Sequence, residues 1–184
     1  LPFEGIATWV STFEPKLCTN ILQFQPELLL TSNEIIKEIG HGKLLKAFLG
    51  RIDNLSSSQF RKFIQSNNLI RLKHSDVEQI LKESLANENL SDVVISVVIE
   101  IIIDCQIINL SNDLAEFVLN FSKLLKNREK ASFALFKLKF SGKALFKMLT
   151  LSQKDDPEKT IKSFALRCLW PNNINSAKLL ELLT

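Results

Sequence analysis

The segment at positions 40–43, Gly-His-Gly-Lys, comes closest in residue type to a phosphate-binding loop. Such a loop needs Gly where this chain has Lys37 and Ser or Thr where it has Leu44. It also follows a buried strand, and this region has the periodicity of a helix. We therefore interpret Gly40 as a helix stop and expect a new helix near Gly42, because glycine tolerates left-handed backbone geometry.

The residues that most often ligate metals or act as nucleophiles are few and scattered. The only histidines, His41 and His74, have no Asp, Glu or Cys at metal-ligand spacing, so we expect each to be solvated or locally hydrogen-bonded. Cys18, Cys105 and Cys168 lie far apart in apolar helical segments, which favours buried, reduced thiols and an intracellular, cytoplasmic location. No nucleophile–base pair is present. The sequence thus predicts no catalytic, cofactor-binding or metal-binding residue, and no enzyme.

Charge is strongly segregated along the chain. The net formal charge is +3, yet Asp76–Glu116 holds one basic and nine acidic residues and Phe117–Lys147 holds eight basic and one acidic. A basic face of this kind is suited to phosphates or to an acidic partner. The candidate interaction residues are Lys123, Lys126, Arg128, Lys130, Lys139, Lys143 and Lys147.

The two charge blocks also allow a structural interpretation, in which consecutive layers of the fold pair their charges with each other. Such pairs would fix orientation more than they would add stability. Against recognition of nucleic acid, the sequence shows no aromatic platform with basic neighbours, no zinc-finger spacing and no Tyr. We therefore expect a protein or another domain of the same chain as the partner, with nucleic acid as the alternative and no membrane.

The elements that position these residues are expected to be helices. Ser75 followed by Glu78 matches a capping box, and Asp156-Pro157 matches a cap with Pro at the first helical position. Ser91 and Ser111 are further expected starts. The predicted helices span residues 3–12, 15–23, 26–30, 33–39, 42–52 and 57–65, with later ones starting at 75, 91, 111, 141 and 156.

The segment Val93–Ile108 is rich in Val and Ile, a composition typical of strands. Its polar residues, however, recur every fourth position at Asp92, Ser96, Glu100 and Asp104. On a helix that spacing gives one narrow polar stripe, so we predict a central helix packed on several sides.

Composition limits the fold class. The 184 residues include only five Gly and five Pro, fewer than all-β folds with many tight turns use. No apolar run reaches the roughly 18 residues of a membrane span. We predict an all-α fold of about ten helices in antiparallel pairs, stacked as a HEAT- or armadillo-like solenoid, with a closed helical bundle as the alternative.

Both ends of the chain carry more distinctive patterns. The segment from Asp155 to Pro171 reads DDPEKTIKSFALRCLWP, and a short joint then leads into a further helical pattern. Leu166, Leu169 and Trp170 can share one buried stripe, and Pro171 would end that helix. We therefore expect Trp170, and Trp9 near the other end, to be core anchors. Near that end, positions 2–9 read PFEGIATW and positions 26–32 read PELLLTS.

These end segments resemble the helical region of bacterial NACHT-type STAND NTPases, and the centre is similar only in its helical layout. The resemblance implies that residues 1–184 form a single HEAT-like repeat domain, a fragment of a larger multidomain protein that transduces signals. It implies a non-catalytic scaffold or sensor role in contacts between proteins or domains, in a setting such as antiphage defence. The NTPase motifs of that family do not occur in this chain.

Overall fold

The computed structural model describes residues 14–30, 32–55, 68–170 and 174. They form ten α-helices and three short 3-10 helices, with no strand among them, which confirms the all-α prediction. The chain divides into two compact units, Leu1–Val97 (unit 1) and Val98–Thr184 (unit 2). The expected helices at 3–12 and 57–65, and Trp9, lie outside the described residues. None of the described helices is long and apolar enough to cross a membrane.

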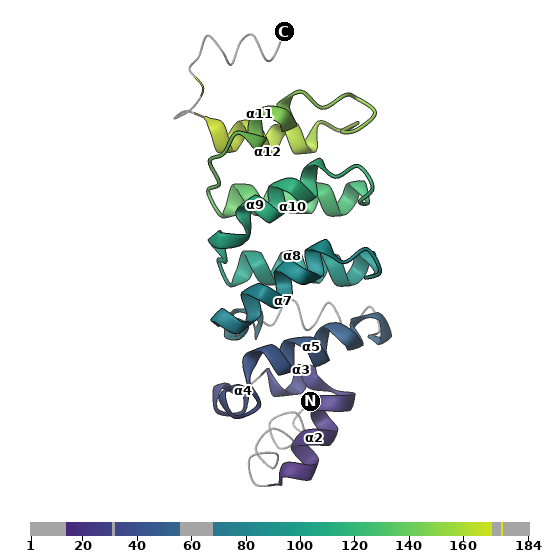
Figure 1. Cartoon of the computed structure of the whole chain (residues 1–184), viewed down its shortest axis with the longest axis vertical. Coiled ribbons are helices and arrows are strands. Elements are labelled where there is room, and N and C mark those ends of the chain that lie inside the picture. Colours follow the sequence, from purple (N-terminus) through teal and green to yellow (C-terminus); the bar gives the residue numbers. More distant parts are fainter. Residues whose placement is uncertain (1–13, 31, 56–67, 171–173, 175–184) are drawn as a thin grey trace. The chain divides into compact units, whose positions relative to one another are not determined.

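Unit 1 is built around α5, against which α2, α3, α4 and α7 pack. Its core contains Leu44, Leu45 and Phe48 of α5, all fully buried. Figure 1 shows α2 leading directly into α3, and α4 directly into α5. Their bounds are α2 (Pro15–Phe24), α3 (Pro26–Leu29), α4 (Asn33–Ile39), α5 (His41–Arg51), η1 (Ile52–Asn54), η2 (Asn68–Leu72) and α7 (Ser75–Ala86).

The junction between α4 and α5 confirms the interpretation of the 40–43 segment. Gly40 has φ 90° and separates the two helices, a backbone geometry that favours glycine. Gly42 lies close to α7, since a Cβ there would lie 3.1 Å from Cδ1 of Ile80. The two glycines therefore set where α5 begins and how closely α7 packs on it.

Helix α8 (Asp92–Asp104) confirms the helix predicted from the polar stripe, although it ends four residues before the predicted end at Ile108. Between Val94 and Ile103 every apolar side chain is buried, whereas Ser96 and Glu100 are only half-buried. The expected start also holds, because the Ser91 hydroxyl accepts the backbone N–H of Val94 at 3.2 Å. The helix runs across the boundary between the two units.

Unit 2 continues from α8 with helices that pack in a regular scheme. Helix α9 packs on α10 and α11, and α12 packs on α10 and α11, as Figure 1 shows. The layer between them is filled by Leu114, Leu135, Met148 and Ile161, all fully buried. The bounds are η3 (Ile108–Leu110), α9 (Ser111–Leu119), α10 (Leu125–Lys137), α11 (Ala144–Leu149) and α12 (Thr160–Leu169).

Three predicted helix starts are wrong in detail: the helix expected to start at residue 141 begins at Ala144, and the other two differ at their caps. Helix α7 does begin at Ser75, but its N-cap is His74, whose Nδ1 accepts the Asp76 N–H at 3.3 Å. The imidazole therefore takes the place of the predicted serine cap.

At the other start, α12 begins at Thr160 rather than at Pro157. The buried carboxylate of Asp156 reaches over the intervening turn and accepts the N–H groups of Ile161 and Lys162 at 3.2 and 2.9 Å. The residue predicted as the cap thus has that role, although the helix starts three residues later.

The expected stripe at the end of α12 is only partly present. Leu169 is fully buried and Leu166 is half-buried, but Trp170 is 42% exposed. Trp170 adopts an extended conformation with ψ 140°, the geometry favoured by a residue that precedes proline. This turn away from the helix axis removes Trp170 from the stripe, so its prediction as a core anchor is wrong.

Candidate functional site

The predicted basic face divides into buried and exposed side chains. Arg128 of α10 lies inside the fold, with 4% of its surface exposed. Its Nε donates to the carbonyl of Val118 at 2.7 Å and its Nη1 to the carbonyl of Asp155 at 3.3 Å. Burial lowers the pKa of Arg128, while the neighbouring acids Asp155 and Asp156 raise it. Arg128 thus joins three segments of unit 2 and is not part of a surface.

Lys130, two residues after Arg128 on α10, pairs with an acid of the preceding block. Its Nζ lies 2.7 Å from Oε2 of Glu100 on α8. Burial raises the pKa of nearby Asp104, Glu100 raises it further, and Lys130 lowers it. At this point the acidic and basic blocks do meet across adjacent helices, as the structural interpretation of the charge pattern expects.

The other basic candidates lie at the surface of unit 2. Lys123 is half-buried, and its ammonium lies 5.7 Å from the centre of the Phe117 ring. The remaining four are exposed and extend from the start of α10 to α11: Lys126, Lys139, Lys143 and Lys147.

A second cationic surface, absent from the sequence-based list, lies where α10 packs on α12. The rings of Phe133 and Phe136 contact that of Phe164, with centroids 5.4 and 5.9 Å apart. Lys137 lies over the Phe133 ring at 5.3 Å and Arg167 over the Phe164 ring at 5.5 Å. We call these five residues the aromatic–cation surface. The three rings are half-buried, and both cationic side chains are exposed.

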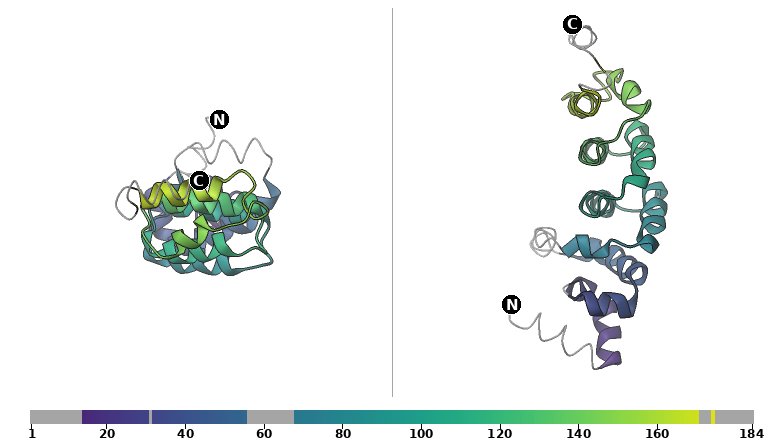
Figure 2. Two further views of the ribbon diagram at one scale, coloured as in Figure 1. Left: turned by 90° about the horizontal axis from the view of Figure 1, so that it is seen from above. Right: turned by 90° about the vertical axis from the view of Figure 1, so that its left-hand side faces the viewer.

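This surface exists because α10 and α12 run in the same direction. Arg128 and Glu129 near the start of α10 face the turn that precedes α12, and Phe133 further along faces Phe164. The right-hand view of Figure 2 shows these two helices end-on and next to each other. Their basic ends therefore coincide. The aromatic residues are about thirty positions apart in sequence, so no local motif could reveal them.

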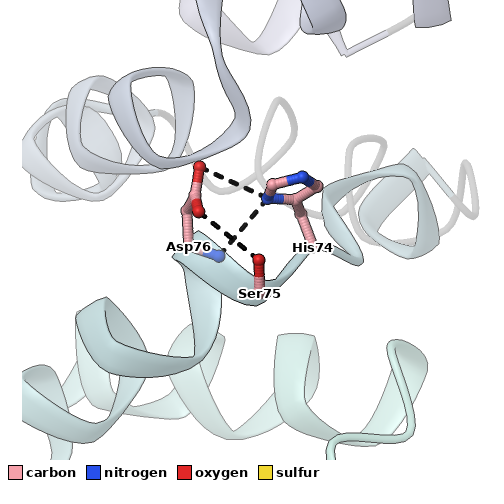
Figure 3. A network of polar contacts seen from close by, with 3 residues as sticks. All are labelled: His74, Ser75 and Asp76. Atoms are coloured by element: carbon pink, nitrogen blue, oxygen red, sulfur yellow. Dashed lines mark hydrogen bonds and ion pairs between the residues drawn. The ribbon is translucent and has the colours of Figure 1, made fainter.

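Unit 1 brings together the two histidines that the sequence left separate. The rings of His41 and His74 are stacked, with centroids 4.5 Å apart and planes inclined by 11°. Nδ1 of His74 also lies 3.3 Å from Oδ2 of Asp76. Figure 3 shows this carboxylate and the Asp76 backbone nitrogen converging on the imidazole at the start of α7. The prediction of a locally hydrogen-bonded histidine is confirmed for His74.

The environment of this pair favours neutral imidazole at His41. Burial lowers the pKa of His41, and His74 and Lys37 lower it further, against the opposing effect of Asp76. Two rings stacked face to face cannot direct their nitrogens at one ion. In the part of the chain that the structure describes, no group of three His, Cys, Asp or Glu side chains could hold a metal ion.

The thiols are free, and two of them titrate above their usual range. Cys105 is buried, whereas Cys18 and Cys168 are half-buried. Burial raises the pKa of Cys18 and raises that of Cys168 to about 11. At neutral pH both are therefore protonated, which is the less nucleophilic form.

Comparison with known proteins gives no further assignment. No protein-family model matches the chain, and neither curated proteins nor solved structures contain a match.

Proposed function

We propose that this chain is a non-catalytic, HEAT-like helical-repeat segment that mediates contacts between proteins or between domains of a larger signal-transducing NTPase. The observation that carries the repeat part is the packing scheme of unit 2. Helices α9 and α10 form one pair, and α11 and α12 form the next. The first helices of the two pairs, α9 and α11, pack on each other, and so do the second helices, α10 and α12.

A closed up-and-down bundle of four helices would instead place α10 beside α11 and α9 beside α12. Packing of like helices is the arrangement by which helical repeats stack. The parallel course of α10 and α12 supports the same proposal, because successive repeats present equivalent helices in equivalent directions.

The NTPase part of the proposal, with its extension to antiphage defence, rests on the resemblance at the chain ends. Its first test is the full reading frame, which should contain a P-loop NTPase module. The second adds purified residues 1–184 to that module and measures ATP hydrolysis. A scaffold or autoinhibitory segment should bind the module and change its rate. A reading frame without such a module would remove the NTPase part and leave the repeat proposal intact.

A second candidate function, binding of a polyanion by the basic block, is favoured by the exposure of Lys143, which precedes α11, and of Lys147 on α11. Lys143→Glu combined with Lys147→Glu should then abolish retention on heparin at low salt. Retention of the double variant equal to that of the parent would exclude this candidate.

A further inference from the structure

The aromatic–cation surface combines a floor of aromatic rings with cations at its border. Its floor consists of three phenylalanine rings from two different helices, with Phe164 of α12 in contact with both Phe133 and Phe136 of α10. Its border consists of two exposed cations, Lys137 and Arg167, each over one of the rings. In the described part of the chain neither cation is paired with a carboxylate. Their positive charge is therefore available to a partner.

Charge is distributed unevenly along this helix pair. The acids of α10 and of the turn before α12, including Glu129 and Glu158, lie at the N-terminal ends of the two helices. Lys137 and Arg167 lie near the C-terminal ends. Lys139 is exposed just beyond α10, and Trp170 is 42% exposed just beyond α12. The C-terminal ends thus present cations and aromatic rings without a described acid between them.

We infer that this surface binds single-stranded nucleic acid. Unpaired bases stack on aromatic rings and on the planar guanidinium of arginine, and the phosphates between them need cations at short range. A duplex keeps its bases stacked inside and offers only phosphates. A surface that places a guanidinium and an ammonium group on aromatic rings offers both kinds of contact, and this favours the single strand. The inference goes beyond the scaffold function and does not depend on it.

This surface also differs from the basic block proposed for polyanions. Lys143 and Lys147 are exposed lysines of the α11 region, outside the aromatic–cation surface. Replacing them removes the same charge as replacing Lys137 and Arg167. The two pairs are therefore matched variants that separate a site on α10 and α12 from general attraction between opposite charges.

The experiment measures the fluorescence anisotropy of labelled 20-nucleotide oligo(dT) and oligo(U) with the 184-residue chain, from low to moderate salt. We expect both strands to bind, and a duplex of equal length to bind at least tenfold more weakly. Lys137→Ala with Arg167→Ala should weaken binding at least tenfold and reduce the slope of log affinity against log salt by about 1.4, the value for two phosphate contacts with a single strand. Lys143→Ala with Lys147→Ala should change the affinity less than threefold.

Two further variants test stacking without changing charge. Phe164→Leu keeps an apolar side chain in the floor, and Trp170→Leu changes an exposed residue that follows α12. Each should weaken binding to oligo(U) severalfold and leave binding to heparin unchanged, since heparin has no bases. Circular dichroism provides the check that the variants fold.

Three results would overturn the inference. The first is no binding of either oligonucleotide at low salt. The second is an equal loss of affinity in the Lys137→Ala, Arg167→Ala variant and in the Lys143→Ala, Lys147→Ala variant. The third is binding of heparin and poly-glutamate in preference to both strands, which would identify a surface for acidic proteins. None of these results would affect the test against an NTPase module.

Discussion

Two arginines of unit 2 each lie over a phenylalanine ring, and their surroundings are opposite. The guanidinium of Arg128 is 4.8 Å from the Phe121 ring and that of Arg167 is 5.5 Å from the Phe164 ring. Arg128 is buried and bonded to two backbone carbonyls, whereas Arg167 is exposed. The comparison shows that a cation–aromatic contact does not by itself define a binding surface. Burial and the other partners of the cation decide whether it supports the fold or is available to a ligand.

The largest effect should come from Arg128. Arg128→Ala leaves the carbonyls of Val118 and Asp155 without their donors and opens a cavity, so the free energy of unfolding should fall by about 2–4 kcal/mol. Arg128→Met should lose less, because it keeps the apolar stem. Chemical denaturation measures both.

The matched control is Arg167→Ala, which removes an exposed cation–aromatic contact and should cost about 0.5–1 kcal/mol. Equal losses for the two alanine variants would contradict the division between a structural and a surface arginine.

The next effect should come from Asp156, which fixes the turn that Arg128 also contacts. Asp156→Ala removes the acceptor for the N–H groups of Ile161 and Lys162, and loss of such a cap costs about 1–2 kcal/mol. Asp156→Asn keeps one side-chain oxygen and should lose about half as much. Glu158→Gln, an exposed change in the same turn, is the control. If Asp156→Ala unfolds at the same denaturant concentration as the control, the cap does not stabilise α12.

Much of the helical fold follows from local sequence patterns. The four-residue spacing of polar positions identified α8 despite its strand-like composition, and Gly40 marked the break between α4 and α5. The start of α12 was wrong because of a side-chain contact that extends beyond the cap motif. The start of α12 moves to Thr160 because Asp156 reaches across a turn in which Lys159 has φ 55°, and neither propensity nor a cap motif specifies that geometry.

The candidate sites were less accessible to sequence analysis. The charge pattern selected Arg128 together with exposed lysines, because the carbonyls that bind it belong to residues 10 and 27 positions away. It also omitted Lys137, whose role depends on a ring and a neighbouring helix. His41 and His74 meet only because α5 and α7 pack closely at Gly42. Contacts of this kind are set by how helices pack, which a pattern along one helix does not determine.

A smaller loss of stability is expected at Lys130. Its side chain is half-buried, so its burial is intermediate between that of Arg128 and that of Arg167, and it pairs with the carboxylate of Glu100. A double-mutant cycle with Lys130→Ala and Glu100→Ala should give a coupling of about 0.2–1 kcal/mol, the range for partly exposed ion pairs. The coupling should shrink in high salt. A coupling of zero at low salt would show that the two charge blocks do not stabilise each other here.

The smallest effect should be the pH dependence contributed by Asp104, whose pKa is raised above 3.8 chiefly by burial. Because the folded state favours the protonated form, this group's contribution to stability is largest at acidic pH and is lost as pH rises through its folded pKa. Asp104→Asn, which cannot ionise, should therefore stabilise the protein slightly at pH 7 relative to the parent, and this advantage should disappear near pH 3.5. Since Lys130 lowers the pKa of Asp104, Lys130→Gln should raise that pKa further, as an NMR titration of the carboxyl carbon would measure. A titration of Asp104 unchanged by Lys130→Gln would show that the lysine acts on Glu100 alone.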